Sequence, residues 1–504
     1  MSTETTPPAA PAPASAPASF ADSLDPHTPQ DWAALRAQGH AMLDDMVDYL
    51  EHLRTRPVWQ PVPETARDRF RLPLPRAAGD LASAHATFME AVLPHAVGNA
   101  HPRFMGWVHG AGTPVGMLAE MLAGGLNANV GGRDQMPVEV ERQVVRWMRE
   151  LFDFPDEASG VFVTGTSMAN LMGLLVARST VLGQQVRAAG LPAQTAHLVA
   201  YTSAAAHGCV AQAMDLAGLG TAALRRIPVD AGHQLRVDAL AEAIARDREA
   251  GLLPFFVAGT AGTVDTGAID PLNDIADLAA REGLWFHVDG AYGALGMLAP
   301  DVAPLLAGIE RADSIAFDFH KWGQVPYDAG FLLVRDGARH AAAFSAPAAY
   351  LQREARGLAG GSPWPCDFGP DLSRGFRALK TWFTFSVYGA DHIGRTISFT
   401  CQLARELAQQ VQADPALELM APVRLNVVCF RYRCAQADEV NREIVADLQV
   451  SGVAAPSSTL IDGELAIRAA IVNHRTTRED IAALLDAVRE AGARRTRIAS
   501  PGSE

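Results

Sequence analysis

Lysine is nearly absent from this chain. Only two of its 504 residues are lysines, Lys321 and Lys380, so arginine carries almost all of the positive charge. With so few lysines, lysine side chains cannot be what keeps the protein surface solvated, so each of the two needs a separate explanation. A desolvated lysine amine can lose its proton and form a Schiff base with an aldehyde, which an arginine cannot do. Lys321, in the segment 312–322, is therefore either such a nucleophile or a surface lysine that the arginine-rich composition has left in place.

The chain also lacks the features of several other protein classes. Its net charge of −14 disfavours nucleic acid as the main partner, because phosphate binding needs a basic face. It has no apolar run long enough to span a bilayer, so no membrane segment is expected. The five cysteines form no CxxC pair, which argues against a disulfide framework or a metal site and favours the reducing cytoplasm.

The N-terminal part divides into a tail and a helical arm. Residues 1–28 are rich in Ala, Pro, Ser and Thr and lack the basic start and apolar stretch of a secretory signal. Such a composition buries too little surface to offset chain entropy, so a disordered tail is predicted. Residues 29–100 predict a helical arm, with helices at 29–53 and 80–93. The arm has few residues with which to close a core, so we expect it to pack on another part, such as a second subunit.

Short apolar strands alternate with helices through the middle of the chain. This alternation predicts an α/β fold with a mainly parallel sheet that helices cover on both faces. Strands are expected at 160–163, 198–202, 255–260, 284–288 and 314–317.

The C-terminal part has a different pattern. A helical stretch after Thr381 reaches about Gln412, and strand-like runs follow at 425–432 and 464–471. These elements predict a smaller α+β domain. The expected organisation is a large domain at 101–385, a small domain at 386–495 and a tail at 496–504.

The segment Val163–Ser167 joins a predicted strand to a predicted helix. Small residues there let backbone N–H groups approach an anion, and a helix N-terminus favours negative charge. The hydroxyls of Thr166 and Ser167 would add donors. The segment is therefore either a cup for a phosphate or an ordinary Gly/Ser turn that caps a helix.

Three more chemical groups follow predicted strands. Asp289 ends one strand, and a buried carboxylate there needs a cationic partner such as a protonated ring nitrogen. His207 could stack on a flat ring or move a proton, or it could simply cap a helix. Lys321 follows the strand at 314–317. Because ligands collect at the carboxyl ends of parallel strands, the four groups together predict a cofactor with a phosphate, a basic ring and an aldehyde: pyridoxal 5'-phosphate (PLP).

From about Gly39 to Arg475 the sequence resembles the group II PLP-dependent amino-acid decarboxylases, such as the aromatic-L-amino-acid, histidine and glutamate decarboxylases. The resemblance implies a large domain of fold-type I (aspartate aminotransferase-like), a small C-terminal domain, and a homodimer with the active site at its interface. The helical arm would then be a swapped dimer clamp. The motifs that carry the resemblance are His101–Phe104, Gly160–Ser167, His287–Ala291, Phe319–Trp322 and Phe376–Trp382.

The resemblance also assigns roles to single residues. It makes Lys321 the Schiff-base lysine, Asp289 the partner of the pyridine nitrogen and His207 the imidazole on the ring. The remaining cofactor-binding residues that it implies are Gly165, Thr166, Ser167, Thr260, Ala291 and His320.

Three departures from the aromatic decarboxylases stand out. Asp318 replaces their usual Asn near the phosphate, and it would repel the phosphate unless protonated or turned away. Their mobile loop carries a tyrosine where this chain has Trp364-Pro365, and Tyr350 upstream could substitute for it. Trp107 and His109 stand where their substrate pocket has aromatic residues followed by Pro-Thr, so the candidate substrate residues are Trp107, His109 and Tyr350.

The function expected from the sequence is decarboxylation of an L-amino acid, aromatic or heteroaromatic, to the amine and CO2. Without the loop tyrosine, reaction with oxygen to an aldehyde, ammonia and peroxide is an alternative. Another PLP-dependent lyase on the same scaffold is a second alternative. A silent cofactor-binding scaffold protein is a third, but the presence of all four chemical groups argues against it.

Overall fold

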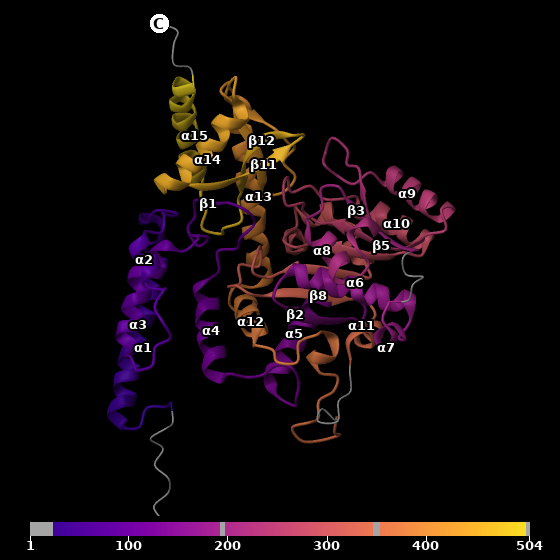
Figure 1. Ribbon diagram of the computed structural model, residues 1–504, viewed down its shortest axis with the longest axis horizontal. Coiled ribbons are helices and arrows are strands. Elements are labelled where there is room, and N and C mark those ends of the chain that lie inside the picture. Colours follow the sequence, from indigo (N-terminus) through magenta and orange to yellow (C-terminus); the bar gives the residue numbers. More distant parts are fainter. Residues whose placement is uncertain (1–23, 192–196, 346–352, 500–504) are drawn as a thin grey trace, which may run out of the picture. The chain divides into compact units, whose positions relative to one another are not determined.

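The computed structural model describes residues 24–191, 197–345 and 353–499 (Figure 1). The chain forms two compact units, one made of the chain up to His52 with Pro63–Pro94, the other of Leu53–Val62 with His95–Glu504. The predicted tail lies mostly outside the described residues, and so does Tyr350. Within the described part, no helix is long and apolar enough to cross a membrane.

The first unit is helical, as the sequence predicts. Helix α1 (Pro29–Glu51) begins after Thr28, whose hydroxyl accepts the Asp31 N–H in a capping box. Helix α2 spans Glu64–Asp68, and α3 (Leu81–Thr87) continues through irregular helical turns. None of the residues of α1 is buried, and three of its apolar side chains, those of Trp32, Leu35 and Val47, are exposed in the single chain.

A seven-stranded sheet forms the centre of the second unit. Its order is β2-β8-β7-β6-β5-β3-β4, and four of its strand pairs are parallel. The mainly parallel α/β sheet predicted from the sequence is therefore confirmed. The strands are β2 (Ser159–Val163), β3 (Leu198–Ser203), β4 (Leu224–Ile227), β5 (Leu253–Thr260), β6 (Trp285–Asp289), β7 (Ser314–Asp318) and β8 (Gly330–Val334).

Two strands of this sheet were not expected, β4 and β8. β8 pairs antiparallel with both β7 and β2. Two antiparallel pairings in succession leave β2 running in the same direction as β7. The carboxyl ends of β2, β3, β5, β6 and β7 therefore lie at one edge of the sheet, which gathers the segments that follow them.

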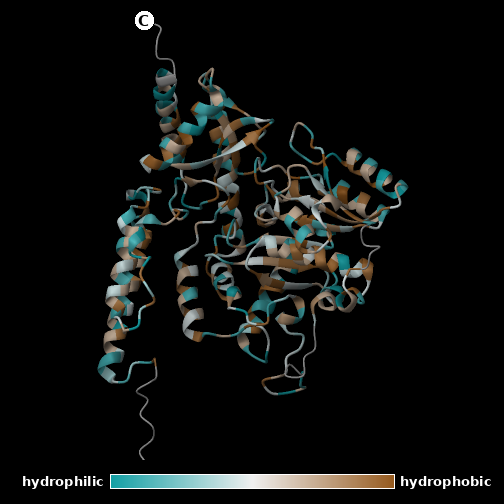
Figure 2. Ribbon diagram, in the orientation of Figure 1, coloured by the Kyte–Doolittle hydropathy of each residue, from teal (hydrophilic) through white to brown (hydrophobic). Residues whose placement is uncertain are grey.

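Helices cover both faces of the sheet. Side chains alternate between the faces along each strand, so strands that are apolar throughout need an apolar partner on each side. Phe286 and Val288 join one apolar core with residues of α5 (Met136–Leu151), α9 (Val237–Glu249) and α10 (Leu272–Glu282). Trp285 joins the other core with α6 (Thr166–Leu182) and α8 (Cys209–Leu216). Figure 2 shows α9 alternating between hydrophilic and hydrophobic residues, as expected for a helix with one buried face.

A second, five-stranded sheet has the order β1-β11-β12-β10-β9. The predicted strands at 425–432 and 464–471 are β10 (Val427–Tyr432) and β12 (Glu464–Ala470). The other strands are β1 (Phe104–Met105), β9 (Leu417–Leu419) and β11 (Ala455–Ile461). Its core includes side chains of α13 (Ala390–Ala413), α14 (Ala437–Ser451) and α15 (Arg478–Ala499).

Two boundaries differ from those expected. β1 pairs with β11, so residues 104–105 belong to the small sheet although they precede the large sheet in sequence. Helix α15 runs to Ala499, into the stretch for which a tail was expected.

Two further helices of the second unit pack against each other. They are α12 (Arg377–Tyr388) and α4 (Pro114–Leu126).

Candidate active site

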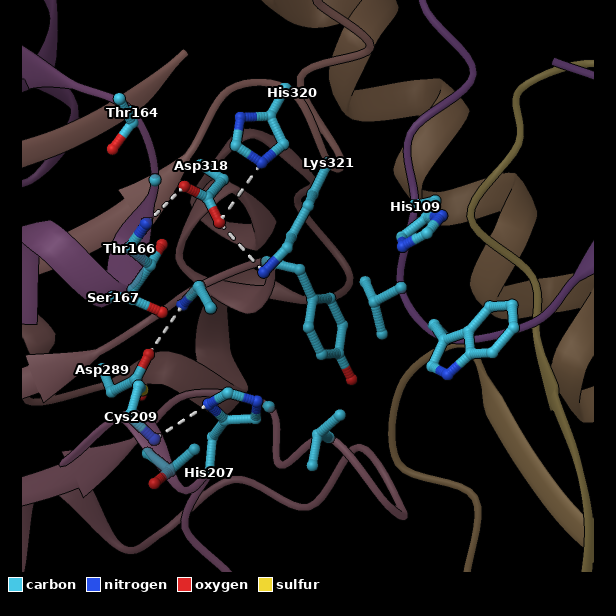
Figure 3. Close-up of a pocket in the computed structure, with 18 of the residues that line it drawn as sticks. His109, Thr164, Thr166, Ser167, His207, Cys209, Asp289, Asp318, His320 and Lys321 are labelled. Atoms are coloured by element: carbon cyan, nitrogen blue, oxygen red, sulfur yellow. Dashed lines mark hydrogen bonds and ion pairs between the residues drawn. The ribbon is translucent and has the colours of Figure 1, made fainter. Parts of the chain in front are cut away.

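A cavity of about 410 Å³ opens at the edge of the large sheet where the strands end. Its lining brings together nearly all of the residues singled out in the sequence (Figure 3). The lining residues are Trp107, Val108, His109, Thr164, Gly165, Thr166, Ser167, His207, Cys209, Thr260, Gly262, Val264, Asp289, Ala291, Tyr292, Asp318, His320, Lys321 and Tyr327.

The predicted phosphate cup is the junction of β2 with α6. The strand ends at Val163 and the helix begins at Thr166, with Gly165 as its N-cap residue. The backbone N–H of Thr166 donates to Asp318 Oδ1 at 2.8 Å. The Thr166 hydroxyl is buried and has no hydrogen-bond partner among the described residues. The cup therefore has a free hydroxyl at a helix N-terminus, where negative charge is favoured.

Asp289 lies at the carboxyl end of β6 and is 2% exposed. Its Oδ2 accepts an N–H of Asn170 at 3.0 Å, and its Oδ1 accepts the Ala291 N–H at 3.2 Å. Burial raises the pKa of Asp289, and the ammonium of Lys321 is the strongest influence that lowers it. A cation brought to this carboxylate would likewise stabilise its charged form.

Lys321 follows β7, and its ammonium lies 2.9 Å from Asp318 Oδ2. Asp318 is 2% exposed, and its two carboxylate oxygens contact Lys321 and the amide of Thr166. The charge of Asp318 is thus balanced by a lysine and a helix N-terminus. In Figure 3, Lys321 lies between Thr166 on one side and His109 on the other.

The neighbouring His320 is oriented by the backbone. Its Nδ1 accepts the Ala329 N–H at 3.0 Å, and its ring lies 4.2 Å from that of Tyr327. Burial lowers the pKa of His320 to about 4, so the imidazole is neutral near pH 7. It therefore does not add a positive charge beside Lys321.

His207, Thr260 and Ala291 also line the cavity. His207 Nδ1 accepts the N–H of Cys209 at 3.2 Å, which leaves the proton of a neutral imidazole on Nε2. Thr260 ends β5, and its hydroxyl is buried with no hydrogen-bond partner among the described residues. All three residues predicted from the sequence thus lie in the lining of one cavity.

One wall of the cavity is aromatic. The His109 ring stacks 5.8 Å from Trp107 and meets Tyr327 edge-on at 6.0 Å. Trp107 is 53% exposed and has a left-handed φ of 47°, a strained conformation for a bulky residue. The chain after this wall packs tightly against the segment that carries Lys321. A Cβ at Gly110 would lie 2.2 Å from the carbonyl oxygen of His320.

Arg468 holds this wall in place, and the sequence analysis missed it. It is 3% exposed and donates to the carbonyl oxygens of Trp107, at 3.1 Å, and Val264. Both of these residues line the cavity. Arg468 comes from β12 of the small sheet, so no local sequence signal links it to either residue.

The sequence analysis also missed Asn170, Cys209, Val264 and Tyr327. Asn170 lies one turn into the helix that the phosphate cup begins, and Cys209 comes two residues after His207, so both were within reach of the motifs. Tyr327 could not be predicted as a lining residue without knowing the path of the segment between β7 and β8. Trp364, at the expected position of the loop tyrosine, is 1% exposed, and the guanidinium of Arg353 lies 3.6 Å over its ring.

The residues of the cavity fit PLP. Three lining residues of the described chain have a buried hydroxyl without a partner, and these hydroxyls offer hydrogen bonds to a ligand with oxygen atoms: Thr166, Thr260 and Tyr292. A buried carboxylate and a lysine amine share the same cavity. No cluster of metal-ligating side chains occurs among the described residues.

Fold and site together define a PLP-dependent enzyme of fold-type I. The chain belongs to the pyridoxal-dependent decarboxylase family, because residues 63–433 match the model of the pyridoxal-dependent decarboxylase conserved domain. It is a PLP-dependent amino-acid decarboxylase, as the sequence predicts.

Its relatives act on different amino acids. The chain is 32% identical to an aromatic-L-amino-acid decarboxylase of Bacillus atrophaeus, over 89% of this chain and 93% of that protein. It is 34% identical to an L-2,4-diaminobutyrate decarboxylase of Rhizobium meliloti, over 83% of each. Among solved structures, Oryza sativa TDC with PLP and tryptamine matches with a TM-score of 0.86 and 26% identity, covering 94% of this chain and 100% of that one.

Proposed function

We propose that the enzyme decarboxylates an aromatic or heteroaromatic L-amino acid to the amine and CO2. The observation that carries this proposal is the aromatic wall of the cavity. Trp107, His109 and Tyr327 present ring faces and edges, and Val108 and Val264 add apolar surface. Such a wall binds a flat side chain by stacking and by burial of apolar surface.

The charged lining residues favour a substrate with an uncharged side chain. Asp318 is paired with Lys321, and Asp289 accepts hydrogen bonds from Asn170 and Ala291. Burial and the neighbouring Lys321 lower the pKa of His109, so its ring is neutral near pH 7. Apart from Lys321, the two lining carboxylates already accept N–H groups of the protein: Asp318 from Thr166, and Asp289 from Asn170 and Ala291, which disfavours the ammonium group of a diaminobutyrate side chain.

In this proposal the described residues have the following roles. Lys321 would hold PLP covalently through its amine, and PLP would supply an electron sink for the bond to the carboxylate that is lost. Asp289 would pair with the ring nitrogen, and His207 would hold the ring. Gly165, Thr166 and Ser167 would bind the phosphate, and Thr260, Ala291 and His320 would hold the rest of the cofactor.

His207 is also the proposed proton donor to the substrate carbon. Its Nδ1 is occupied by the Cys209 N–H, so its proton lies on Nε2. Trp364 is buried under Arg353 and offers no hydroxyl in the place of the loop tyrosine. The alternative product route uses molecular oxygen as the oxidant and gives the aldehyde, ammonia, CO2 and peroxide.

We further propose that the enzyme acts as a cytoplasmic homodimer with its active site at the interface. All five cysteines are free thiols, in keeping with a reducing compartment. Helix α4 carries four exposed apolar side chains in the single chain, on Leu118, Met121, Leu122 and Leu126. Exposed stripes of this kind are typical of subunit interfaces.

The test is mass spectrometry of a mixed pool of L-amino acids incubated with the purified protein and PLP. We expect one aromatic amino acid to disappear as its amine appears, with no peroxide. An aldehyde with peroxide would establish the oxidative route, and loss of 2,4-diaminobutyrate would contradict the aromatic assignment.

A borohydride experiment tests the lysine. Reduction should attach the cofactor to Lys321, and peptide mapping has to distinguish it from only one other lysine, Lys380. Lys321→Ala should abolish turnover and the attached cofactor. Attachment at Lys380 would refute the assignment.

A further inference from the structure

A chain of buried hydrogen bonds runs from Asp289 into the protein, away from the cavity. Asn170 Nδ2 donates to Asp289 Oδ2 at 3.0 Å, and Asn170 Oδ1 lies 2.8 Å from His287 Nε2. His287 Nδ1 lies 2.7 Å from Ser314 Oγ, which accepts the Trp285 Nε1–H at 2.8 Å. These five side chains are all at most 6% exposed.

The strand geometry explains why they meet. Trp285, His287 and Asp289 alternate along β6, so their side chains lie on the same face of the sheet, the face that α6 covers. Ser314 is the register partner of His287 on β7. Asn170 belongs to α6, so one helix begins with the phosphate cup and also reaches Asp289.

The direction of each hydrogen bond follows from the chemistry of its ends. A carboxylate only accepts, so the Asn170 amide must turn its NH₂ to Asp289 and its oxygen to His287. His287 must then carry its proton on Nε2. Its unprotonated Nδ1 accepts the Ser314 hydroxyl proton, and the Ser314 oxygen accepts from Trp285. Every donor and acceptor on this path is satisfied.

Two further observations fit a neutral, closely held imidazole. A Cβ at Gly173, one turn beyond Asn170 on α6, would lie 2.9 Å from Cε1 of His287, so the glycine leaves room for the ring. The ring also stacks 5.5 Å from Phe256. Burial lowers the pKa of His287 to about 3, so it does not become a second cation near Asp289.

We infer that His287 is a positioning residue that acts through Asn170 on Asp289, and thereby on the ring nitrogen of the bound cofactor. With His287 in place, the Asn170 amide cannot turn its oxygen toward the carboxylate, so Asp289 keeps a donor and stays ionised opposite the ring nitrogen. The inference rests on the proposed pairing of Asp289 with that nitrogen. His287 itself does not line the cavity.

The test compares the binding of PLP with that of its 1-deaza analogue, in which a carbon replaces the ring nitrogen. Each is titrated into the full chain freed of cofactor, and the ratio of the two dissociation constants measures the preference for nitrogen. His287→Phe should lower this preference about tenfold, the size expected from losing one hydrogen bond to a charged group. Binding of the deaza analogue should hardly change.

The chain offers a matched control in His340. It is also fully buried, its Nδ1 lies 2.8 Å from a serine oxygen, Ser159 Oγ, and burial lowers its pKa to about 3. It does not belong to the hydrogen-bond chain of Asp289. His340→Phe should leave the nitrogen preference unchanged, and His287→Gln, which keeps an N–H donor for Asn170, should restore most of it.

Two other variants separate the possible failures. Asp289→Asn should abolish the nitrogen preference, and if it does not, the pairing of Asp289 with the ring nitrogen is wrong. If Asp289→Asn does abolish it while a folded His287→Phe binds both compounds like the wild type, the inference about His287 is wrong. Should His287→Phe not fold, Asn170→Ala decides, because an unchanged preference in that variant would equally overturn the inference.

Discussion

Asp318 is the residue that departs most from expectation for a phosphate site. Its carboxylate accepts the Thr166 N–H of the proposed cup and contacts the Lys321 ammonium. An aspartate is therefore tolerated at this position, because the N-terminus of α6 and the Lys321 ammonium offset its charge. The Asp318 carboxylate would still place one negative charge beside the phosphate of PLP, which would itself carry about two negative charges.

Replacement of Asp318 by Asn should therefore tighten PLP binding. The Asn oxygen can still accept the Thr166 N–H, while repulsion of the phosphate is removed and Lys321 loses its ion-pair partner. We expect the PLP dissociation constant to fall about threefold to tenfold, that is by about 1 kcal/mol. Asp336→Asn, on an exposed helix cap, is the control. Weaker binding in Asp318→Asn would mean that the carboxylate supports the site.

At the scale of elements, the antiparallel strand β8 decides the shape of the phosphate cup. Its first residue, Gly330, is the register partner of both Val163 on β2 and Asp318 on β7. A Cβ at Gly330 would lie 2.4 Å from the Cα of Gly165. The cup can therefore lie directly against β8 only because residue 330 has no side chain.

Gly330→Ala should displace the cup and weaken PLP binding by about tenfold or more, since a backbone contact of this kind cannot relax by a side-chain rotation. The change is measured as the PLP dissociation constant together with the thermal midpoint of the cofactor-free chain. Gly375→Ala, where a Cβ would meet nothing within 4 Å, should leave both nearly unchanged. Wild-type affinity in Gly330→Ala would show that the cup is less tightly supported than the contact implies.

At the scale of the whole molecule, the exposed apolar stripe of α4 bears on assembly. Leu122 is 49% exposed in the single chain, beside Met121 at 56%. Leu122→Asp should convert the proposed dimer to monomers and reduce activity, because a charge cannot be buried unpaired at an interface. Light scattering measures the mass. Leu216→Asp, at an exposed leucine of α8, is the control, and an active wild-type monomer would contradict the dimer.

Acid should destabilise the molecule through its buried histidines. Burial lowers the pKa to about 3 or 4 in five of them: His101, His287, His320, His340 and His474. Each stays neutral in the fold but binds a proton near pH 6.5 once unfolded. Below pH 6.5 the unfolded chain therefore binds more protons, and the unfolding free energy falls by up to ~1.4 kcal/mol per pH unit for each histidine.

Buried carboxyl groups with raised pKa values act in the opposite direction. They are Asp270, at about 6, together with Asp289 and Asp313, so three acids oppose five histidines. The denaturant midpoint should thus be lower at pH 5 than at pH 7.5. His340→Phe should reduce this pH dependence and His40→Gln, on exposed helix α1, should not. A midpoint that rises on acidification would contradict the assignment.

The sequence by itself determined the α/β class, the cofactor and the residues that line the proposed cofactor cavity. Those residues directly follow strands, and carboxyl ends of parallel strands meet at one edge whatever the loops between them do. Lys321, Asp289, His207 and the cup Gly165–Ser167 were predictable for this reason.

Only the tertiary structure revealed the supports of these residues. Arg468 reaches the aromatic wall of the cavity from β12, and His287 contacts Asn170 of α6, which donates to Asp289. The antiparallel course of β8 brings Gly330 against the cup. These contacts join residues far apart in the chain, and their partners are set by register and packing, for which a single sequence carries no local pattern.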